Sequence, residues 1–314
     1  MTQVSSDGPT VQVLELDPSA DLSSPGVRRD ALDALEGGGV VLLHGRGFEL
    51  TEREREVISD TRSMLEGVQE EETRNGRPTI IYEPWRGKIK RAHFASVGGR
   101  YVRARVSAAA VPDVQAMMAR FGSWAGELIA SLFPRYQASL ARDRITYRPH
   151  GRRSTQALHI DSAYGYPTQG RGMLRLFCNI DPGERPRVWQ VGEPFVPFAQ
   201  RFLPSTHPRR PGRAATLLRS LGIVRGSKTA YDQLVADLRR IAKHDREYQG
   251  TAPRRIVEFP SGSSWFAITD LVLHGAVSGQ QSLDQTFLLP SAAMADSSRS
   301  SLRILERLTG RALV

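Results

Sequence analysis

Residues 159–180 read His159-Ile-Asp-Ser-Ala-Tyr-Gly-Tyr-Pro-Thr-Gln-Gly-Arg-Gly-Met-Leu-Arg-Leu-Phe-Cys-Asn-Ile180. The last part, 173–180, is an apolar run bounded by glycine and aspartate, which predicts a β-strand. At the start of the stretch, His159 and Asp161 stand two positions apart. Residues i and i+2 of an extended chain point to the same face, so these two side chains can reach one metal ion.

Short predicted strands dominate the second half of the chain. Besides 173–180, they lie at 144–148, 187–191, 255–259, 264–268 and 285–289. Each is bounded by Gly, Pro, Ser or Asp, a pattern typical of a double-sheet barrel or jelly roll. Residues 195–254 interrupt this pattern with a mainly helical insertion, in which 230–244 has helical spacing of its apolar residues.

The first half is predicted to be mainly helical, over residues 1–142. Helices are expected at 24–35, after Thr51, and most clearly at 112–132, where an apolar stripe follows Pro112. Short strands are expected at 10–16 and 40–43, whereas 69–100 looks rich in loops. We therefore predict one α+β domain over 1–314, with a β core at 143–290, the inserted lobe at 195–254 and a C-terminal helix in 291–314.

A third metal ligand is predicted at the end of another apolar segment, Trp265-Phe-Ala-Ile-Thr-Asp-Leu-Val-Leu-His274. Two histidines and one carboxylate on one side of a metal leave three positions open, as in the facial triad of non-haem Fe(II) oxygenases. In such a site the co-substrate takes two positions and dioxygen the third. A His-X-Asp triplet is common by chance, so the argument depends on the neighbouring strands.

A co-substrate such as 2-oxoglutarate also needs a cation for its far carboxylate, and a guanidinium fits because its planar fork binds carboxylates. Many enzymes with this triad carry an arginine about ten residues after the distal histidine, but 275–287 contains none. Arg175, inside the apolar strand 173–180, is the alternative, since a charge there must face a cavity or be paired. A structural ion pair of Arg175 with Asp284 is the competing interpretation.

Other polar residues are candidates for the same cavity. Gln285 and Phe287 are expected on one face of the last strand, where Gln285 could bind a carboxylate through hydrogen bonds. Tyr147 and Arg148 precede the metal motif on another strand, and either could bind the co-substrate or substrate. Asp270 is expected to be a turn residue, with support of a metal ligand as the alternative.

Composition narrows the class of partner. The formal net charge is +10, mostly from arginine, which favours anionic partners such as phosphorylated sugars, phospholipid headgroups or nucleic acid. Arginine in place of lysine through genomic base composition explains the charge equally well. No nucleic-acid-binding motif stands out, so no nucleic acid is expected. A single cysteine, Cys178, and the lack of a signal-like or membrane-spanning stretch favour a cytoplasmic protein.

Several segments together resemble one enzyme family. The stretch 159–180, followed by Pro186-Arg-Val-Trp-Gln-Val-Gly-Glu-Pro-Phe195, is similar to the Kdo (3-deoxy-D-manno-octulosonic acid) hydroxylases. Shorter similar segments are Trp85–Lys88, Arg201–Pro204, Tyr231–Asp232, Phe259–Trp265, Thr269–His274 and Gln285–Pro290. The resemblance extends from about Pro78 to the C-terminus, and the block from Arg187 to Phe195 is its most specific part.

The resemblance implies a double-stranded β-helix, Fe(II), 2-oxoglutarate and dioxygen. It also implies hydroxylation at C3 of a Kdo sugar on a lipid A precursor, an anionic glycolipid at the cytoplasmic face of the inner membrane. A basic protein could contact that surface peripherally. The loop 162–166, Ser-Ala-Tyr-Gly-Tyr, departs from the Ala-Phe-Pro-type run of the family, so the same reaction on another sugar or a small secondary metabolite is an alternative.

Two other classes of function stay open on the sequence. A metal-binding β-barrel that acts as a sensor or binding protein would keep the metal ligands without turning over 2-oxoglutarate. A nucleic-acid-binding protein would rest on charge alone. The basic residues Arg209, Arg210 and Arg213 of the inserted lobe could form part of a lid over the site or a solvated loop. The oligomeric state is not indicated by any pattern.

Overall fold

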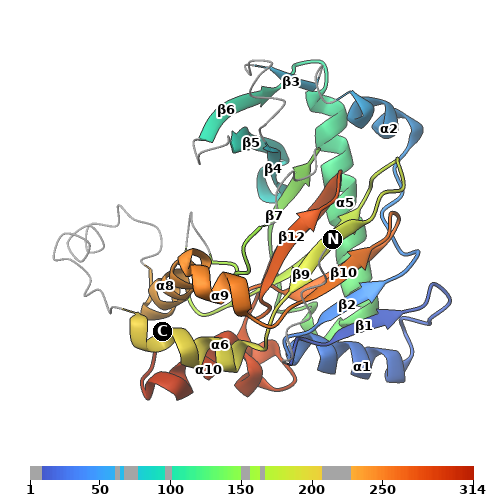
Figure 1. Cartoon of the computed structure of the whole chain (residues 1–314). Helices are drawn as coiled ribbons and strands as arrows, with labels where there is room; N and C mark the ends of the chain where they lie inside the picture. Colours follow the sequence, from blue (N-terminus) through green and yellow to red (C-terminus); the bar gives the residue numbers. More distant parts are fainter. Residues whose placement is uncertain are drawn as a thin grey trace.

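The structure, a computed structural model, describes residues 9–60, 64–66, 77–95, 101–149, 156–162, 167–206 and 228–314 (Figure 1). The helices are α1 (Pro25–Glu36), α2 (Glu52–Ser59), α5 (Val111–Leu132), α6 (Phe195–Phe202), α8 (Ala230–His244), α9 (Arg246–Thr251) and α10 (Ser301–Thr309). The strands are β1 (Val13–Leu16), β2 (Val40–Leu43), β3 (Leu65–Glu66), β4 (Arg77–Glu83), β5 (Lys88–Ala95), β6 (Tyr101–Val106), β7 (Ala141–Arg148), β8 (Gly172–Asn179), β9 (Arg187–Val191), β10 (Arg255–Phe259), β11 (Ser264–Ile268), β12 (His274–Ser278) and β13 (Ser282–Leu289).

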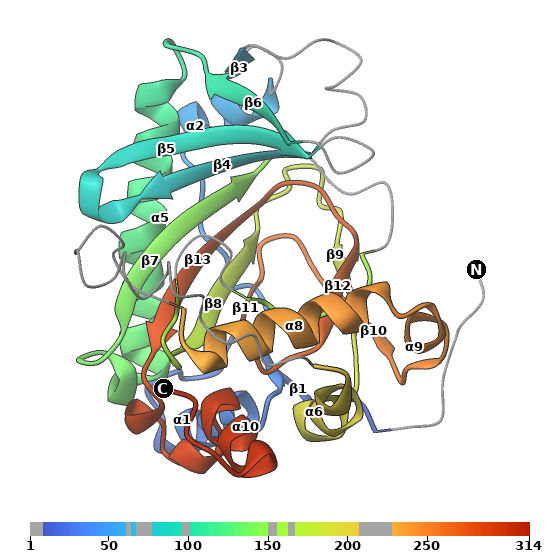
Figure 2. The same cartoon turned by 90° about the vertical axis from the view of Figure 1, so that its left-hand side faces the viewer.

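The described strands form two sheets. A ten-stranded sheet has the order β1-β2-β11-β8-β13-β7-β4-β5-β6-β3, and a three-stranded sheet has the order β10-β9-β12. All neighbours pair antiparallel except β1 with β2. Figure 2 shows β4, β7, β13, β8 and β11 following one another across the larger sheet. The predicted α+β class is confirmed.

Aromatic side chains fill the space between the two sheets. Trp189 of β9 packs edge-on against Phe177 of β8 and Trp265 of β11, with ring centroids 4.8 and 5.5 Å apart. Phe259 of β10 stacks on Trp265 at 4.0 Å. The smaller sheet therefore lies face to face with the centre of the larger one, over a shared apolar core.

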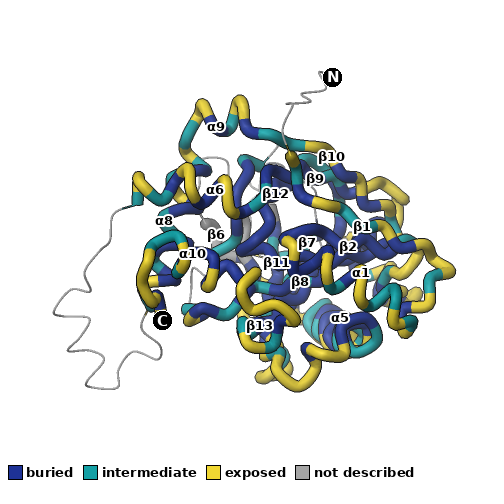
Figure 3. The backbone as a smooth tube through the Cα atoms, turned by 90° about the horizontal axis from the view of Figure 1, so that it is seen from below, coloured by how far each residue is buried: buried dark blue, intermediate teal, exposed yellow. Residues whose placement is uncertain are grey.

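The opposite face of the larger sheet is covered by helices. Leu174 and Leu176 of β8 belong to the same core cluster as Leu35 of α1 and Ile129 of α5. Helix α5 forms where predicted because proline stands in its first turn, Asp113 complements the helix dipole, and an apolar stripe faces the sheet. Figure 3 shows buried strands in the middle of the molecule, with exposed residues along the outer sides of the helices.

The inserted lobe contributes α6, α8 and α9, which gather with α10 at one end of the molecule (Figures 1 and 2). Thr229 and Asp232 form a capping box that begins α8. From α9, Gln249 accepts a hydrogen bond from Leu158 N at 2.8 Å and donates one to Leu158 O at 2.9 Å. The lobe thus holds the backbone next to the predicted ligand His159.

Three expectations need correction. The part described within 69–100 holds β4 and β5 rather than loops, and the described part of 1–142 contains six complete strands beside its helices. Strands β1 and β2 lie where the sequence predicts them, whereas β4, β5 and β6 were missed because Lys and Arg interrupt their apolar pattern. Strand β12 was also missed, since Gly275 and small residues give it a weak strand signal. The C-terminal helix is shorter than expected, at Ser301–Thr309. The residues Arg209, Arg210 and Arg213 lie outside the described residues.

Within the described ranges, no helix combines the length and the apolar character needed to cross a membrane.

Candidate metal centre

His159 and His274 come together through their backbones. His159 N donates to His274 O at 3.0 Å, and His274 N donates to His159 O at 2.9 Å, so the segment around His159 lies beside β12. Gly275 permits this close approach, because a Cβ there would lie 2.4 Å from the carbonyl oxygen of Gln156. With Asp161, one ligand atom from each residue lies within 4.8 Å of the others.

Both histidines present the same ring nitrogen to the site. Nδ1 of His159 lies 2.8 Å from Ala157 O, and Nδ1 of His274 lies 2.9 Å from Val272 O. When Nδ1–H donates to these carbonyls, Nε2 keeps its lone pair for a metal. Burial lowers the pKa of both rings, that of His159 to about 3, which favours the neutral form that binds metal.

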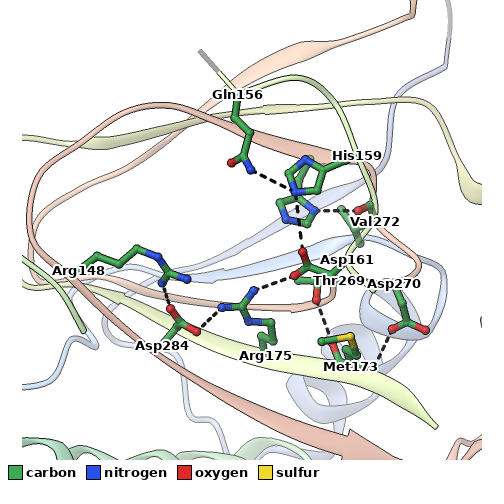
Figure 4. Close-up of polar contacts among 11 residues, drawn as sticks. Arg148, Gln156, His159, Asp161, Met173, Arg175, Thr269, Asp270, Val272 and Asp284 are labelled. Atoms are coloured by element: carbon green, nitrogen blue, oxygen red, sulfur yellow. Dashed lines mark hydrogen bonds and ion pairs between the residues drawn. The ribbon is translucent and has the colours of Figure 1, made fainter. Parts of the chain in front are cut away.

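Asp161 completes the set from a fixed position (Figure 4). Its backbone N donates to Thr269 O at 2.7 Å, and its Oδ2 accepts from Arg175 Nη1 at 2.7 Å. The other oxygen, Oδ1, lies 3.7 Å from Nε2 of His159. Burial alone would raise the pKa of Asp161, but Arg175 and the two histidines hold it below its usual value. Two imidazole nitrogens and one carboxylate oxygen fit a non-haem iron.

Arg175 lies on the predicted face of β8. Its guanidinium stands over the ring of Phe177, 4.6 Å from the centroid, inside the space between the sheets. Besides Asp161, it donates through Nη2 to Asp284, which also accepts from Arg148 Nη1. The ion pair with Asp284 is therefore present, and the role of Arg175 as a co-substrate anchor stays a prediction.

Two more arginines reinforce the positive charge here. Burial, and to a smaller extent the charge of Arg175, lower the pKa of Arg187 to about 10. Burial, Arg175 and Arg187 likewise lower the pKa of Arg148. Three guanidinium groups face two carboxylates here, those of Asp161 and Asp284, and the net positive charge favours a bound anion.

Comparison with known proteins assigns the family. A family model described as 3-deoxy-D-manno-oct-2-ulosonic acid (Kdo) hydroxylase matches residues 19–312. This chain belongs to the Kdo hydroxylase family. The prediction made from the sequence, both of the family and of an enzyme that hydroxylates, is confirmed. No match was found among curated proteins.

Solved structures of a Kdo hydroxylase, KdoO, are similar over nearly the whole chain. KdoO is a non-heme Fe(II) alphaketoglutarate-dependent dioxygenase, and its complex with cobalt(II) is 29% identical, with a TM-score of 0.80. The match covers 96% of this chain and 97% of that one. The complex of KdoO with alphaketoglutarate and Fe(III) is 27% identical over the same shares, with a TM-score of 0.79.

Tyr147 and Gln285 do not reach the metal ligands of this Kdo hydroxylase family member. Tyr147 is fully buried in the core cluster beside α5, and its hydroxyl donates to Gln281 Oε1 at 3.3 Å. The side chain of Gln285 lies near Gly122 of α5, on the same side of the sheet. Both strands alternate, so their neighbours Arg148 and Asp284 face the site instead. On each strand, the residue that faces the site is therefore the neighbour of the residue predicted to do so.

Asp270 connects strand β8 to two helices through side-chain hydrogen bonds. Its Oδ1 accepts from Met173 N at 2.6 Å, and its Oδ2 accepts from Tyr231 of α8 at 2.8 Å and from Ser301 of α10 at 2.5 Å. The residue thus joins β8 to two helices at a turn, which agrees with the expectation of a turn residue. Burial raises the pKa of its carboxyl group.

Three residues near the ligands were missed as site residues. Gln156 Nε2 lies 3.3 Å from Nε2 of His159, and Trp189 stacks on His274 with centroids 5.0 Å apart. Arg239 of α8 is buried, and its charge lowers the pKa of both histidines and of Asp161. A signal for Arg239 existed in the sequence, since it lies on the apolar stripe of α8, four residues after Val235.

A small cavity of about 10 Å³ lies beside Asp161. It is lined by Asp161, Ser162, Thr168, Met173, Tyr231, Asp232, Val235 and Asp270. Three of these residues belong to α8, so this helix closes the space next to the metal ligand. Arg239 lies further along the same buried side of α8 as the residues that line the cavity.

Proposed function

We propose that this chain is an Fe(II)- and 2-oxoglutarate-dependent dioxygenase that hydroxylates C3 of a Kdo sugar on a lipid A precursor. The observation that carries the proposal is the triad of His159, Asp161 and His274, in which one ligand atom of each residue lies within 4.8 Å of the others. Membership of the Kdo hydroxylase family supports the substrate class. Cobalt(II), Fe(III) and alphaketoglutarate in structures of KdoO support the cofactors.

The fold belongs to the same proposal. Strands β11-β8-β13-β7 of the larger sheet lie opposite β10-β9-β12, and the backbone at His159 continues the smaller sheet beside β12. Four antiparallel strands facing four is the arrangement of a jelly roll. We interpret this core as the predicted double-stranded β-helix, with one ligand pair on the smaller sheet.

His159, Asp161 and His274 would hold the iron. When bound, iron and 2-oxoglutarate supply the activation of dioxygen and the cleavage of the substrate C–H bond. The protein contributes position: the two carbonyls of Ala157 and Val272 orient the imidazoles, and Arg175 orients Asp161. The apolar and aromatic wall formed by Trp189 and Phe177 keeps water from the space between the sheets.

The far carboxylate of 2-oxoglutarate is proposed to bind at Arg175, supported by Arg148 and Arg187. The Nε of Arg175 and the Nε of Arg187 are buried, and neither has a hydrogen-bond partner among the described residues. Buried donors without acceptors are uncommon, so an incoming carboxylate would satisfy them. This assignment replaces Tyr147 and Gln285, which lie on the other side of the sheet.

The substrate is proposed to be anionic. The carboxylate of a Kdo sugar is a fitting partner for Arg239, which lies on α8 next to the metal ligands. A formal net charge of +10 suits a phosphorylated glycolipid and a peripheral contact with the inner-membrane surface. The departure of the loop 162–166 from the family pattern favours one alternative, the same reaction on another sugar or a small secondary metabolite.

The test is succinate release by Fe(II)-loaded protein given 2-oxoglutarate and dioxygen, with a Kdo-capped lipid A precursor, with free Kdo, or with neither. His274→Ala serves as the control for background decarboxylation. We expect the lipid to stimulate succinate release and to gain one oxygen atom on its Kdo. Slow release that ignores both sugars would point to a different substrate. No release from iron-loaded protein would leave a metal-binding protein without this activity.

A further inference from the structure

Asp284 lies on β13, ten residues after His274 in the sequence. Its side chain has no exposed surface. On β13 it pairs in register with Thr146 of β7 on one side and Phe177 of β8 on the other. A carboxylate is therefore buried at the centre of the larger sheet, on the face that points toward the metal ligands.

Two arginines from the neighbouring strands share this carboxylate (Figure 4). Its Oδ1 accepts from Nη2 of Arg175 on β8, and its Oδ2 accepts from Nη1 of Arg148 on β7. A buried carboxylate is costly unless it is paired, and here each oxygen has its own guanidinium. Asp284 in turn fixes the positions of the two guanidinium groups, which would otherwise repel each other.

The three nitrogen atoms of the Arg175 guanidinium differ in their hydrogen-bond partners. Nη1 donates to the metal ligand Asp161 at 2.7 Å, and Nη2 donates to Asp284. Only Nε is buried without a partner in the part of the chain that the structure describes. Since a guanidinium is planar and rigid, fixing its two terminal nitrogens also fixes the direction of Nε–H.

We propose that Asp284 is a positioning residue for the co-substrate: it holds Arg148 and Arg175 so that their remaining donors meet the far carboxylate of 2-oxoglutarate. An anion on β13 thus organises two cations on the adjacent strands β8 and β7. The inference rests on the proposed function, because it assumes that 2-oxoglutarate binds beside the metal. It assigns to Asp284 no contact with substrate or metal.

The experiment measures the dissociation constant of 2-oxoglutarate for cobalt(II)-loaded protein by calorimetry, which needs no turnover. We expect Asp284→Asn to raise this constant by about 10-fold or more, in the range seen when residues that support a site are changed. In the iron enzyme, the KM for 2-oxoglutarate should rise by a similar factor, while kcat changes less. A general loss of activity with an unchanged dissociation constant would overturn the proposal.

A matched control is Asp181→Asn. Asp181 is also a fully buried carboxylate paired with an arginine, but it lies after the end of β8, and it accepts from the exposed Arg185 rather than from Arg175 or Arg148. This variant should bind 2-oxoglutarate like the wild type. An equal weakening in both variants would mean that loss of any buried carboxylate acts through stability alone, and the positioning role would be wrong.

Asp284→Asn alone leaves Arg148 without its carboxylate and Arg175 with Asp161 as its one carboxylate partner, and the variant could fail to fold. The double variant Asp284→Asn with Arg148→Gln removes one charge of each sign, and a thermal unfolding scan establishes that it is folded. It should bind 2-oxoglutarate more weakly than the wild type, because Nη2 of Arg175 has lost its acceptor on Asp284. Binding equal to the wild type would overturn the proposal. A wild type that binds metal but no 2-oxoglutarate would overturn the proposed function itself.

Discussion

Each histidine of the metal centre is oriented by the carbonyl oxygen two residues before it, Ala157 O for His159 and Val272 O for His274. The identity of the residue at those two positions does not matter to this contact, because it is a backbone carbonyl. What the fold must supply is the path of the chain, which the paired backbones of His159 and His274 provide. Local chain geometry therefore sets the orientation of each ring, and the pairing of two distant segments brings the rings together.

Replacement of Arg175 is expected to weaken the binding of 2-oxoglutarate. Arg175→Met removes charge-assisted hydrogen bonds worth about 1.5–3 kcal/mol each, so the KM for 2-oxoglutarate should rise by about 10-fold to 150-fold. Arg185→Met, at an exposed arginine in the loop that follows β8, is the control. Steady-state kinetics check both variants, and an unchanged KM in Arg175→Met would remove this residue as the anchor.

A variant at Tyr147 tests whether this side chain faces the core and not the co-substrate site. Tyr147→Phe removes one buried hydrogen bond to Gln281 and keeps the ring in its core cluster. We expect the free energy of unfolding to fall by about 0.5–1.5 kcal/mol, with no change in the KM for 2-oxoglutarate. Urea unfolding and kinetics measure the two quantities. A large rise in KM would show that Tyr147 reaches the co-substrate after all.

At the scale of elements, the contact between the His159 segment and β12 decides whether the ligands meet. Gly275→Val places a side chain where a Cβ would lie 2.4 Å from Gln156 O, so the two backbones must separate. We expect cobalt(II) affinity to fall by about 10-fold or more. The free energy of unfolding should decrease by about 1–3 kcal/mol.

The control for this prediction is Gly250→Ala in α9, where a Cβ would meet nothing within 4 Å. That variant should keep full cobalt(II) affinity and lose no stability, since alanine favours a helix over glycine. Titration with cobalt(II) followed by absorption measures the affinity. Tight binding by Gly275→Val would mean that the close approach of the two segments is not needed for the site.

The strands show where sequence reasoning succeeds. Residues 187–191, 255–259 and 264–268 were predicted with the bounds that the structure has, because branched and aromatic residues lie between turn formers. The position of Arg175 was also predicted, since a charge inside an apolar strand can only face a polar space. In contrast, every residue of β13 is buried. A strand that is covered on both faces shows no alternation of polar and apolar residues. The sequence therefore does not reveal which face of the sheet Gln285 points to.

Contacts between distant segments mark the limit of that reasoning. The buried position of Arg239 follows from helical spacing, but its closeness to the metal ligands depends on how α8 docks. The tie of Asp270 to Tyr231 and Ser301 likewise joins residues far apart in the chain. Such contacts come from packing of whole elements, for which one sequence carries little information.

At the scale of the whole molecule, the buried histidines link stability to pH in the metal-free protein. Burial lowers the folded-state pKa of His159 and His274 below the value of about 6.5 for an unfolded histidine. Below that pH the unfolded chain takes up protons that the folded chain does not. The free energy of unfolding should therefore fall as the pH drops from about 7 to about 5, approaching about 1.4 kcal/mol per pH unit for each histidine.

Urea unfolding across this pH range checks the prediction. The lowered pKa of Asp161 acts only below its usual value of 3.8, outside the window. A variant with His159→Gln and His274→Gln cannot take up these protons in either state, so its stability should depend less on pH. Equal slopes for the variant and the metal-free wild type would contradict the assignment of two buried neutral histidines.

The central claim is that this chain uses dioxygen to hydroxylate a Kdo sugar at a metal held by His159, Asp161 and His274. The most direct test is the mass of the sugar product formed under isotopically labelled dioxygen by the iron-loaded enzyme with 2-oxoglutarate and the Kdo-capped lipid. We predict one labelled oxygen atom on the Kdo, and none with the His274→Ala variant. An unmodified lipid, or an added oxygen that comes from water, would contradict the account.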